Sequence, residues 1–242
     1  MGRAAIRLSP MPRNADQFFQ FLTVISESTN ESDSVELELL IPLLSDKIRQ
    51  ENGNPYSDSN LRGVLRNIAR FGLINHESEN DKAIVQLRVD LVNKEEHNLG
   101  QIILDSLVRL GFDNDPYIVD MLFDYTEIVK ESEEEALSNS DFMERTSSKS
   151  SDVPNGNPVS GYDYSELTKE GKDRAVKEMI KIIEYFGVLL SKGGGKYSLG
   201  SNDKITSILS TLRGLKIERF VGNCISQIGP EHKIFKNKKS GQ

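Results

Sequence analysis

The spacing of apolar residues predicts three helices in the first third of the chain. They are expected at about residues 16–26, 34–50 and 59–71, where apolar side chains recur at every third or fourth position and so share one face. Asn14 is the expected N-cap of the first helix. Pro42 lies inside the second and is expected to kink or split it, because proline has no backbone N–H to donate and its ring clashes with the preceding turn.

The third predicted helix leads into a hairpin. Gly72 ends the helix, Leu73 begins a short strand, and a polar turn connects this strand to residues 83–89, which are rich in β-branched side chains. Residues 98–138 are again expected to be helical, with a break near residues 111–116.

The same order of elements returns near the end of the sequence. Residues 172–186 (KDRAVKEMIKIIEYF) predict an amphipathic helix that stops at Gly187, and residues 188–199 predict a second hairpin. RFGLI at 70–74 and YFGVL at 185–189 therefore occupy the same place in two units. Either an imperfect internal duplication or coincidence explains this likeness.

A change in composition separates the two units. The stretch TSSKSSDVPNGNPVSG is rich in Ser, Asn, Pro and Gly and has almost nothing to bury, which is typical of a linker. The predicted organisation is an N-terminal unit at residues 1–95, a helical segment at 96–145, a flexible linker at 146–163 and a second unit with a basic end at 164–242.

The overall composition is that of a soluble globular protein, with 37% hydrophobic and 28% charged residues. No stretch approaches the roughly 18 apolar residues of a membrane span, and the first residues lack the features of a signal peptide. The single cysteine, Cys224, cannot form an internal disulfide, which fits a reducing compartment. We therefore expect a cytoplasmic protein without a membrane partner.

The net charge of −7 means that any contact with nucleic acid must be local, because proteins that coat nucleic acid with their whole surface are usually basic. The charge is unevenly distributed. Residues 127–135 (EIVKESEEE) are strongly acidic, whereas residues 233–239 (KIFKNKK) are basic.

Three helices followed by a hairpin, with a basic third helix that ends in Phe-Gly-Leu-Ile, resemble the winged helix-turn-helix superfamily. The resemblance covers residues 14–90 and, less completely, residues 164–215, where two upstream helices are not evident before Gly171. It implies a mainly α fold with short β-hairpins, built as tandem winged-helix units. It also implies double-stranded DNA as a partner, with the third helix in the major groove and the hairpin, or wing, against the backbone.

The predicted third helix carries the candidate DNA contacts of the first unit. Arg62, Arg66 and Arg70 form a stripe on its exposed side, and Asn60 and Asn67 flank that stripe. Arginine can bind phosphate or guanine and asparagine can read adenine, so Asn67 is the candidate base reader. The alternative is an ordinary solvated face. The acidic tip of the first hairpin, residues 77–81 (ESEND), would be repelled by phosphate.

In the second unit the candidate contacts are basic side chains on the predicted helix and around the hairpin tip. They are Arg174, Lys177 and Lys181 on one helical face, with Lys192 and Lys196 on either side of three glycines. A glycine-rich tip could approach a phosphate backbone closely. The alternative here is an exposed helix with a flexible hairpin.

The sequence contains no recognisable catalytic, metal-binding or cofactor motif. His76, His97 and His232 are scattered, so no zinc site is expected. The stretch GGGKYS lacks the first glycine and the Lys-Ser/Thr pair of a phosphate-binding loop. We therefore expect a binding protein without a cofactor and not an enzyme.

Two functions fit these features, and a small enzyme is a third. The leading hypothesis is a DNA-binding recognition or accessory subunit of a larger complex, of a regulatory or genome-defence type, in a prokaryotic-type cytoplasm. The alternative is an adaptor, since tandem winged-helix proteins also bind proteins, for example as subunits that clasp the linker chain of chromosome-organising ATPase complexes. The negative net charge and the acidic first hairpin fit the adaptor better. Both functions require a protein partner, and the sequence leaves a homodimer open.

Overall fold

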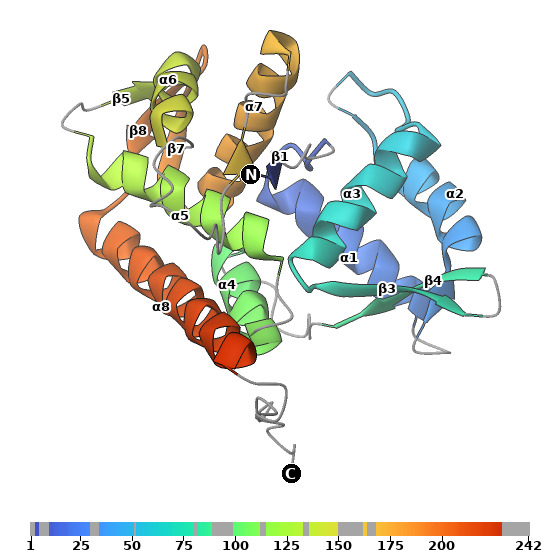
Figure 1. Cartoon of the computed structure of the whole chain (residues 1–242). Helices are drawn as coiled ribbons and strands as arrows, with labels where there is room; N and C mark the ends of the chain where they lie inside the picture. Colours follow the sequence, from blue (N-terminus) through green and yellow to red (C-terminus); the bar gives the residue numbers. More distant parts are fainter. Residues whose placement is uncertain are drawn as a thin grey trace.

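The computed structural model describes residues 3–4, 10–29, 34–50, 52–79, 82–88, 99–111, 115–132, 136–149, 162–163 and 168–228. Within these ranges most residues are helical, and the strands form small sheets (Figure 1). The predicted mainly α fold with short β-hairpins is therefore confirmed. Among the described helices, none combines the length and the apolar composition that a bilayer span requires.

The first unit consists of three helices and an antiparallel sheet. Its elements are α1 (Ala15–Thr29), β2 (Val35–Glu36), α2 (Leu37–Lys47), α3 (Asp58–Arg70), β3 (Ile74–Glu79) and β4 (Lys82–Leu87). The sheet order is β2-β4-β3, so the short strand before α2 pairs with the second strand of the hairpin.

The second unit repeats this order of elements. It contains α5 (Pro116–Lys130), β5 (Ala136–Ser138), α6 (Asn139–Lys149), α7 (Lys169–Tyr185), β7 (Leu189–Gly193) and β8 (Lys196–Leu199). The sheet order β5-β8-β7 is again antiparallel throughout and matches that of the first unit. One helix follows each hairpin, α4 (Leu99–Leu110) and α8 (Asn202–Ile228), and β1 (Arg3–Ala4) pairs in parallel with β6 (Tyr162–Asp163).

The two units end their third helices in the same way. Gly72 and Gly187 have positive φ angles of 72° and 64°, which glycine adopts without steric cost. In both units the glycine amide donates to the carbonyl three residues back at 2.8 Å, and the next amide donates to the carbonyl five residues back at 3.3 Å. This shared geometry supports an internal duplication over coincidence.

The second unit has two upstream helices, which sequence reasoning did not assign to it. Residues 98–138 were expected to form a separate helical segment, but Ala136–Ser138 pair with β8, so α5, β5 and α6 complete the second unit. A strand of three residues is too short to produce a recognisable alternation of polar and apolar positions.

The predicted linker at 146–163 was placed wrongly at both ends. Residues 146–149 finish α6, where Thr146 is buried and its hydroxyl donates to the Phe142 carbonyl at 2.6 Å. Tyr162–Asp163 form β6, and residues 150–161 lie outside the described residues. The predicted linker therefore connects two helices of the same unit and is not a boundary between units.

The helix predicted at 34–50 is shorter, and it is not split. It begins at Leu37 because the two preceding residues form β2, and it continues through Pro42 to Lys47. Both Pro42 and Glu38 are exposed, so water can reach the part of the helix where the Glu38 carbonyl loses its helical donor at Pro42.

Helix α4 connects the two units. At its C-terminal end, Arg109 donates to the Gly72 carbonyl at 3.3 Å and to the Arg88 carbonyl at 2.7 Å, both in the first unit. At its N-terminal end, Gly100 lies so close to α7 that an added Cβ would be 2.5 Å from the Phe186 Cα. Gly100 therefore allows α4 to approach the second unit while α4 also contacts the first.

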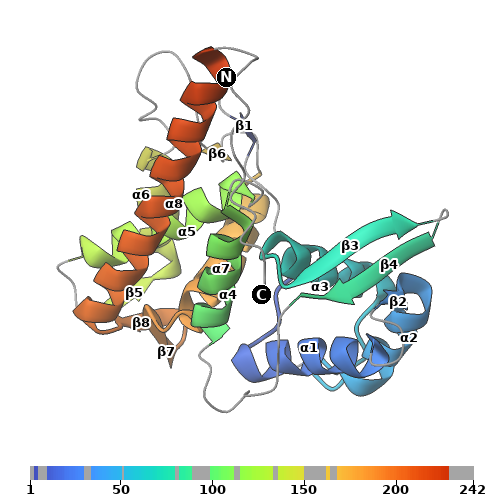
Figure 2. The same cartoon turned by 90° about the horizontal axis from the view of Figure 1, so that it is seen from below.

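Helix α8 covers the side of the second unit that faces away from the first unit (Figure 2). It packs along α5 through a buried ion pair, with the Arg219 Nη2 2.7 Å from the Asp120 Oδ1. The Lys216 ammonium lies 3.4 Å from the same oxygen and 4.4 Å from the centre of the Phe123 ring. These contacts fix α8 on the outside of the second unit.

Replacing Gly100 by alanine tests the close approach of α4 to α7. A second glycine measures how much the higher helix propensity of alanine contributes to stability by itself. Gly214 is the matched control, because it is also helical and an added Cβ there meets nothing within 4 Å. We expect Gly214→Ala to raise the free energy of unfolding by about 0.5–1 kcal/mol. Gly100→Ala should lower it by about 1–3 kcal/mol through backbone displacement. Urea denaturation measures both, and a stabilised Gly100→Ala variant would refute the close approach.

Candidate functional site

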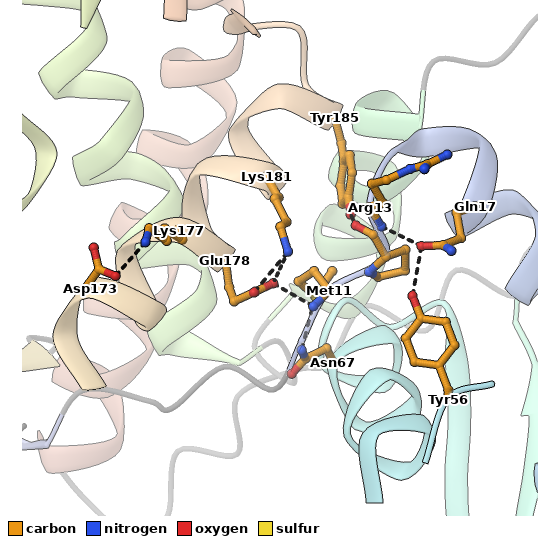
Figure 3. Close-up of polar contacts among 11 residues, drawn as sticks. Met11, Arg13, Gln17, Tyr56, Asn67, Asp173, Lys177, Glu178, Lys181 and Tyr185 are labelled. Atoms are coloured by element: carbon orange, nitrogen blue, oxygen red, sulfur yellow. Dashed lines mark hydrogen bonds and ion pairs between the residues drawn. The ribbon is translucent and has the colours of Figure 1, made fainter. Parts of the chain in front are cut away.

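A short segment that precedes α1 lies between the third helices of the two units (Figure 3). We call residues 11–13 the inserted segment. The Met11 amide donates to the Glu178 Oε2 of α7 at 2.7 Å, and the Tyr185 hydroxyl of α7 donates to the Pro12 carbonyl. From the other side, the Asn67 Nδ2 of α3 donates to the Met11 Sδ at 3.1 Å. Both third helices therefore contact Met11, and α7 also binds Pro12.

Side chains of the first unit hold the other end of the inserted segment. The Gln17 Oε1 accepts from the Arg13 amide at 2.6 Å and from the Tyr56 hydroxyl at 3.1 Å. The Gln17 Nε2 donates to the Arg49 carbonyl at 2.9 Å, which uses the remaining polar end of the side chain. One buried glutamine thus links the inserted segment, α1 and the loop before α3.

Burial fixes the protonation state of the two tyrosines at this site. Desolvation raises the pKa of Tyr185 far above its usual range, and the Glu178 and Glu184 carboxylates raise it further. Desolvation also raises the pKa of Tyr56, partly offset by its hydrogen bond to Gln17. Both hydroxyls therefore remain hydrogen-bond donors at physiological pH. Phe18 packs edge-on against the Tyr185 ring, with the ring centres 5.6 Å apart.

The three arginines predicted to bind DNA lie in different surroundings. The Arg62 Nη2 is 2.8 Å from both carboxylate oxygens of Glu38. The Arg70 Nε is 3.5 Å from the Asp115 Oδ2. Arg66 is exposed and has no ion pair among the described residues. Two of the three predicted contacts on α3 are therefore paired with carboxylates.

Of the two asparagines of α3, Asn67 is not available as a base reader. Asn67 is 1% exposed and its amide contacts Met11, so the prediction that it reads a base is wrong. The helical period correctly placed it beside the arginine stripe, but the inserted segment covers that flank. The backbone N–H of Asn60 donates to the Ser57 Oγ at 3.3 Å, so this residue lies in the capped first turn of α3, and its side chain stays a predicted contact.

Some of the predicted basic contacts of the second unit are also paired with carboxylates, and others are not. The Lys177 ammonium lies 2.7 Å from the Asp173 Oδ2, and the Lys181 ammonium lies 3.0 Å from both carboxylate oxygens of Glu178. Of the predicted contacts, Arg174, Lys192 and Lys196 are exposed and have no ion pair among the described residues. The turn between Lys192 and Lys196 contains three glycines with positive φ angles.

Some predicted features fall outside the described residues. Asn80 and Asp81 of the acidic hairpin tip do so, although the paired strands extend to Glu79 and Lys82 on either side of them. The basic stretch at residues 233–239 and the histidines at 97 and 232 also lie outside.

Sequence reasoning missed the inserted segment, Glu178 and Tyr185. The one available signal was the pair of prolines in SPMPRN, since proline favours extended backbone in the residue before it. Such backbone has no internal hydrogen bonds and must find partners when it is buried. Nothing in the local pattern identifies α3 and α7 as the elements that supply those partners.

Neither a cluster of metal ligands among the described residues nor a similar known protein points to a function. In the part of the chain that the structure describes, no three Asp, Glu, His or Cys residues are grouped so that they could hold a metal ion. Comparison with models of protein families, with curated proteins and with solved structures finds no match.

Removing the hydroxyl of Tyr185 should weaken the attachment of the inserted segment. Tyr185→Phe leaves the buried Pro12 carbonyl without its donor, so we expect the free energy of unfolding to fall by about 1–3 kcal/mol. Tyr197→Phe is the control, since this half-buried tyrosine makes no hydrogen bond with its hydroxyl within the described residues. It should change stability by less than about 0.5 kcal/mol. Equal stability losses in urea denaturation would contradict the role of Tyr185.

Proposed function

We propose that the chain is a tandem winged-helix adaptor that binds other proteins within a larger assembly. One observation carries this proposal. The inserted segment covers the Asn67 flank of α3 and binds Glu178 and Tyr185 of α7, so part of each third helix, the element that would carry nucleic-acid contacts in a winged-helix DNA-binding protein, is used inside the molecule. The order helix, strand, helix, helix, strand, strand occurs twice with the same sheet order, which supports the winged-helix assignment.

Charge supports an adaptor as well. Arg62, Lys177 and Lys181 each lie within 3.0 Å of a carboxylate, so the positive potential of the third helices is reduced. Exposed ion pairs contribute only up to about 1 kcal/mol, so these side chains can still exchange partners. A phosphate would nevertheless have to displace a carboxylate at each of them, on a chain whose net charge is −7.

Exposed apolar side chains offer surfaces of the kind that proteins bind. On α2, Leu39 and Leu43 are solvent-exposed, and on α8, Ile217, Phe220 and Val221 lie on one exposed face. Grouped exposed apolar side chains are typical of protein interfaces. The single cysteine, Cys224, lies in the same helix as a free thiol, which fits an assembly in the cytoplasm.

DNA binding through the second hairpin is a second candidate function. It is favoured by Lys192 and Lys196, which are exposed on either side of the glycine turn and have no ion pair among the described residues. Arg174 on α7 adds a third such cation. Contacts of this kind would position the protein on a phosphate backbone without reading the sequence.

A titration of the chain with fluorescently labelled duplex DNA distinguishes the two functions. An adaptor should give no saturable anisotropy change at about 200 mM salt, and at most weak binding at about 50 mM. If the hairpin binds DNA, Lys192→Glu with Lys196→Glu should abolish binding, whereas removing Arg62, Arg66 and Arg70 should have little effect. Saturable binding at the higher salt that either set of substitutions removes would overturn the adaptor proposal.

The adaptor proposal also requires a positive result. The tagged chain should co-purify from its own cells with the same protein in a fixed ratio, and nuclease treatment should leave that ratio unchanged. Loss of the co-purifying protein on nuclease treatment would show that DNA connects the two.

A further inference from the structure

The outer face of α8 carries apolar side chains at the spacing of a coiled coil. Ile217 is 57% exposed, Val221 is 47% exposed, and Cys224 is partly exposed one turn further along the helix. Gly214 precedes them and the sequence places Ile228 after them, so the five positions follow one another in steps of three and four residues. This is the heptad pattern of a helix that packs along a second helix. We call these five positions the α8 seam.

The α8 seam faces away from the rest of the molecule. The buried side of α8, which includes Leu215 and Arg219, packs on α5. A helix turns by about 100° per residue, so Ile217 lies about 160° from both of these residues. Figure 1 shows α8 at the edge of the molecule, with α5 on one side and no helix or strand drawn on the other. A second helix can therefore reach the seam without displacing any described element.

The charges beside the seam indicate which helix this is. Arg213 lies on one side of the seam and Glu218 on the other, and both are exposed. Arg213 lies over the Phe123 ring, 5.7 Å from its centre, and neither Arg213 nor Glu218 has an ion pair among the described residues. Residues five apart on one helix point about 140° away from each other, so the two cannot pair within one chain.

A second copy of α8 supplies the missing partner for each charge. When two parallel helices are aligned in register, the side chain just before one seam position faces the side chain five residues further along the other helix. Arg213 of each copy then faces Glu218 of the other, and the two-fold symmetry forms this pair twice. The chain is therefore complementary to itself in both shape and charge along this helix.

The same alignment also covers the remaining exposed aromatic side chain of α8. Phe220 is 52% exposed and lies one heptad after Arg213, so it faces Ile225 of the other copy. The antiparallel alignment that pairs Ile217 with Val221 would instead bring the two Glu218 carboxylates together, which is repulsive. Charge therefore favours the parallel alignment.

We propose that the α8 seams of two copies pack in parallel and in register as a short coiled coil, which makes the protein a symmetric homodimer. Burial of Ile217 and Val221 supplies the affinity, and the pairs between Arg213 and Glu218 set direction and register. The seam is only about 21 Å long, so we expect a weak dimer with a Kd of about 1–100 μM. This self-association does not depend on whether the chain also binds a protein partner or DNA.

Sedimentation velocity of the full-length chain tests the dimer. Wild type should shift from monomer to dimer as its concentration rises from about 1 to 200 μM. Ile217→Ser with Val221→Ser should weaken dimerisation by at least about tenfold, because the apolar contact is lost. Both side chains are exposed, so the variant should keep its circular dichroism spectrum. Leu39→Ser with Leu43→Ser, an exposed pair at the same spacing on α2, is the matched control and should dimerise as wild type does.

Exchanging the charges tests the direction and the register. Arg213→Glu and Glu218→Arg should each weaken dimerisation by about threefold to tenfold at low salt, because like charges then face each other. An equimolar mixture of the two variants should form a heterodimer, since both pairs then carry opposite charges. A chain with both substitutions should dimerise as wild type does. A mixture that associates no better than either variant alone would refute the pairing.

Cys224 reports on the alignment without any substitution. In the proposed dimer the two Cys224 thiols face each other, so diamide, which oxidises two thiols to a disulfide, should produce a covalent dimer on a non-reducing gel. Ile217→Ser with Val221→Ser should prevent this cross-link at the same protein concentration. Cys224→Ser should abolish the cross-link but still sediment as a dimer.

Three results would overturn the proposal. The first is a chain that stays monomeric at every concentration, and the second is a dimer that the serine substitutions on α8 leave intact. The third is a dimer that never cross-links, because in the antiparallel alignment Cys224 faces Gly214 of the other copy. Dimers that disappear only in the α2 control would likewise place the interface on α2 and not on α8.

Discussion

Two helices from different units contact the same short segment of the chain, and this shared contact constrains the rest of the molecule. The Met11 amide and the Pro12 carbonyl are buried, and buried backbone groups without partners are costly. Glu178 and Tyr185 supply those partners from α7, and Asn67 contacts Met11 from α3. The units must therefore keep a fixed separation and orientation, which α4 reinforces because it contacts both of them.

This constraint determines which surfaces remain for partners. The faces of α3 and α7 that meet the inserted segment are used for internal packing, and several of the nearby cations are paired with carboxylates. The remaining exposed features lie on the outer elements: the exposed leucines of α2, the apolar face of α8 and the lysines around the second hairpin tip. Any partner must approach the molecule from outside the region where the units meet.

The elements that repeat a local period could be predicted from the sequence, and those that depend on distant partners could not. The helical spacing of apolar residues identified α1, α3 and α7, and the glycine after Phe71 and after Phe186 identified both helix ends. The strands β2 and β5 escaped prediction because two or three residues show no period, and α6 did because most of its residues are polar.

The same contrast between local periods and distant partners explains which parts of the candidate site could be predicted. Periodicity correctly placed Asn67 beside the arginine stripe, but its contact with Met11 joins residues 56 positions apart, and that of Met11 with Glu178 joins residues 167 apart. Local spacing does not reveal such pairs.

The covalent connection between the units has a consequence for how the molecule responds to dilution. If the two repeats were separate chains, the contacts around Met11 and Gly100 would depend on protein concentration. Within one chain they form at an effective concentration that is set by the connecting residues and reaches the millimolar range for short connections. The contact between the two repeats therefore persists at low protein concentration, at which an equivalent pair of separate subunits would dissociate.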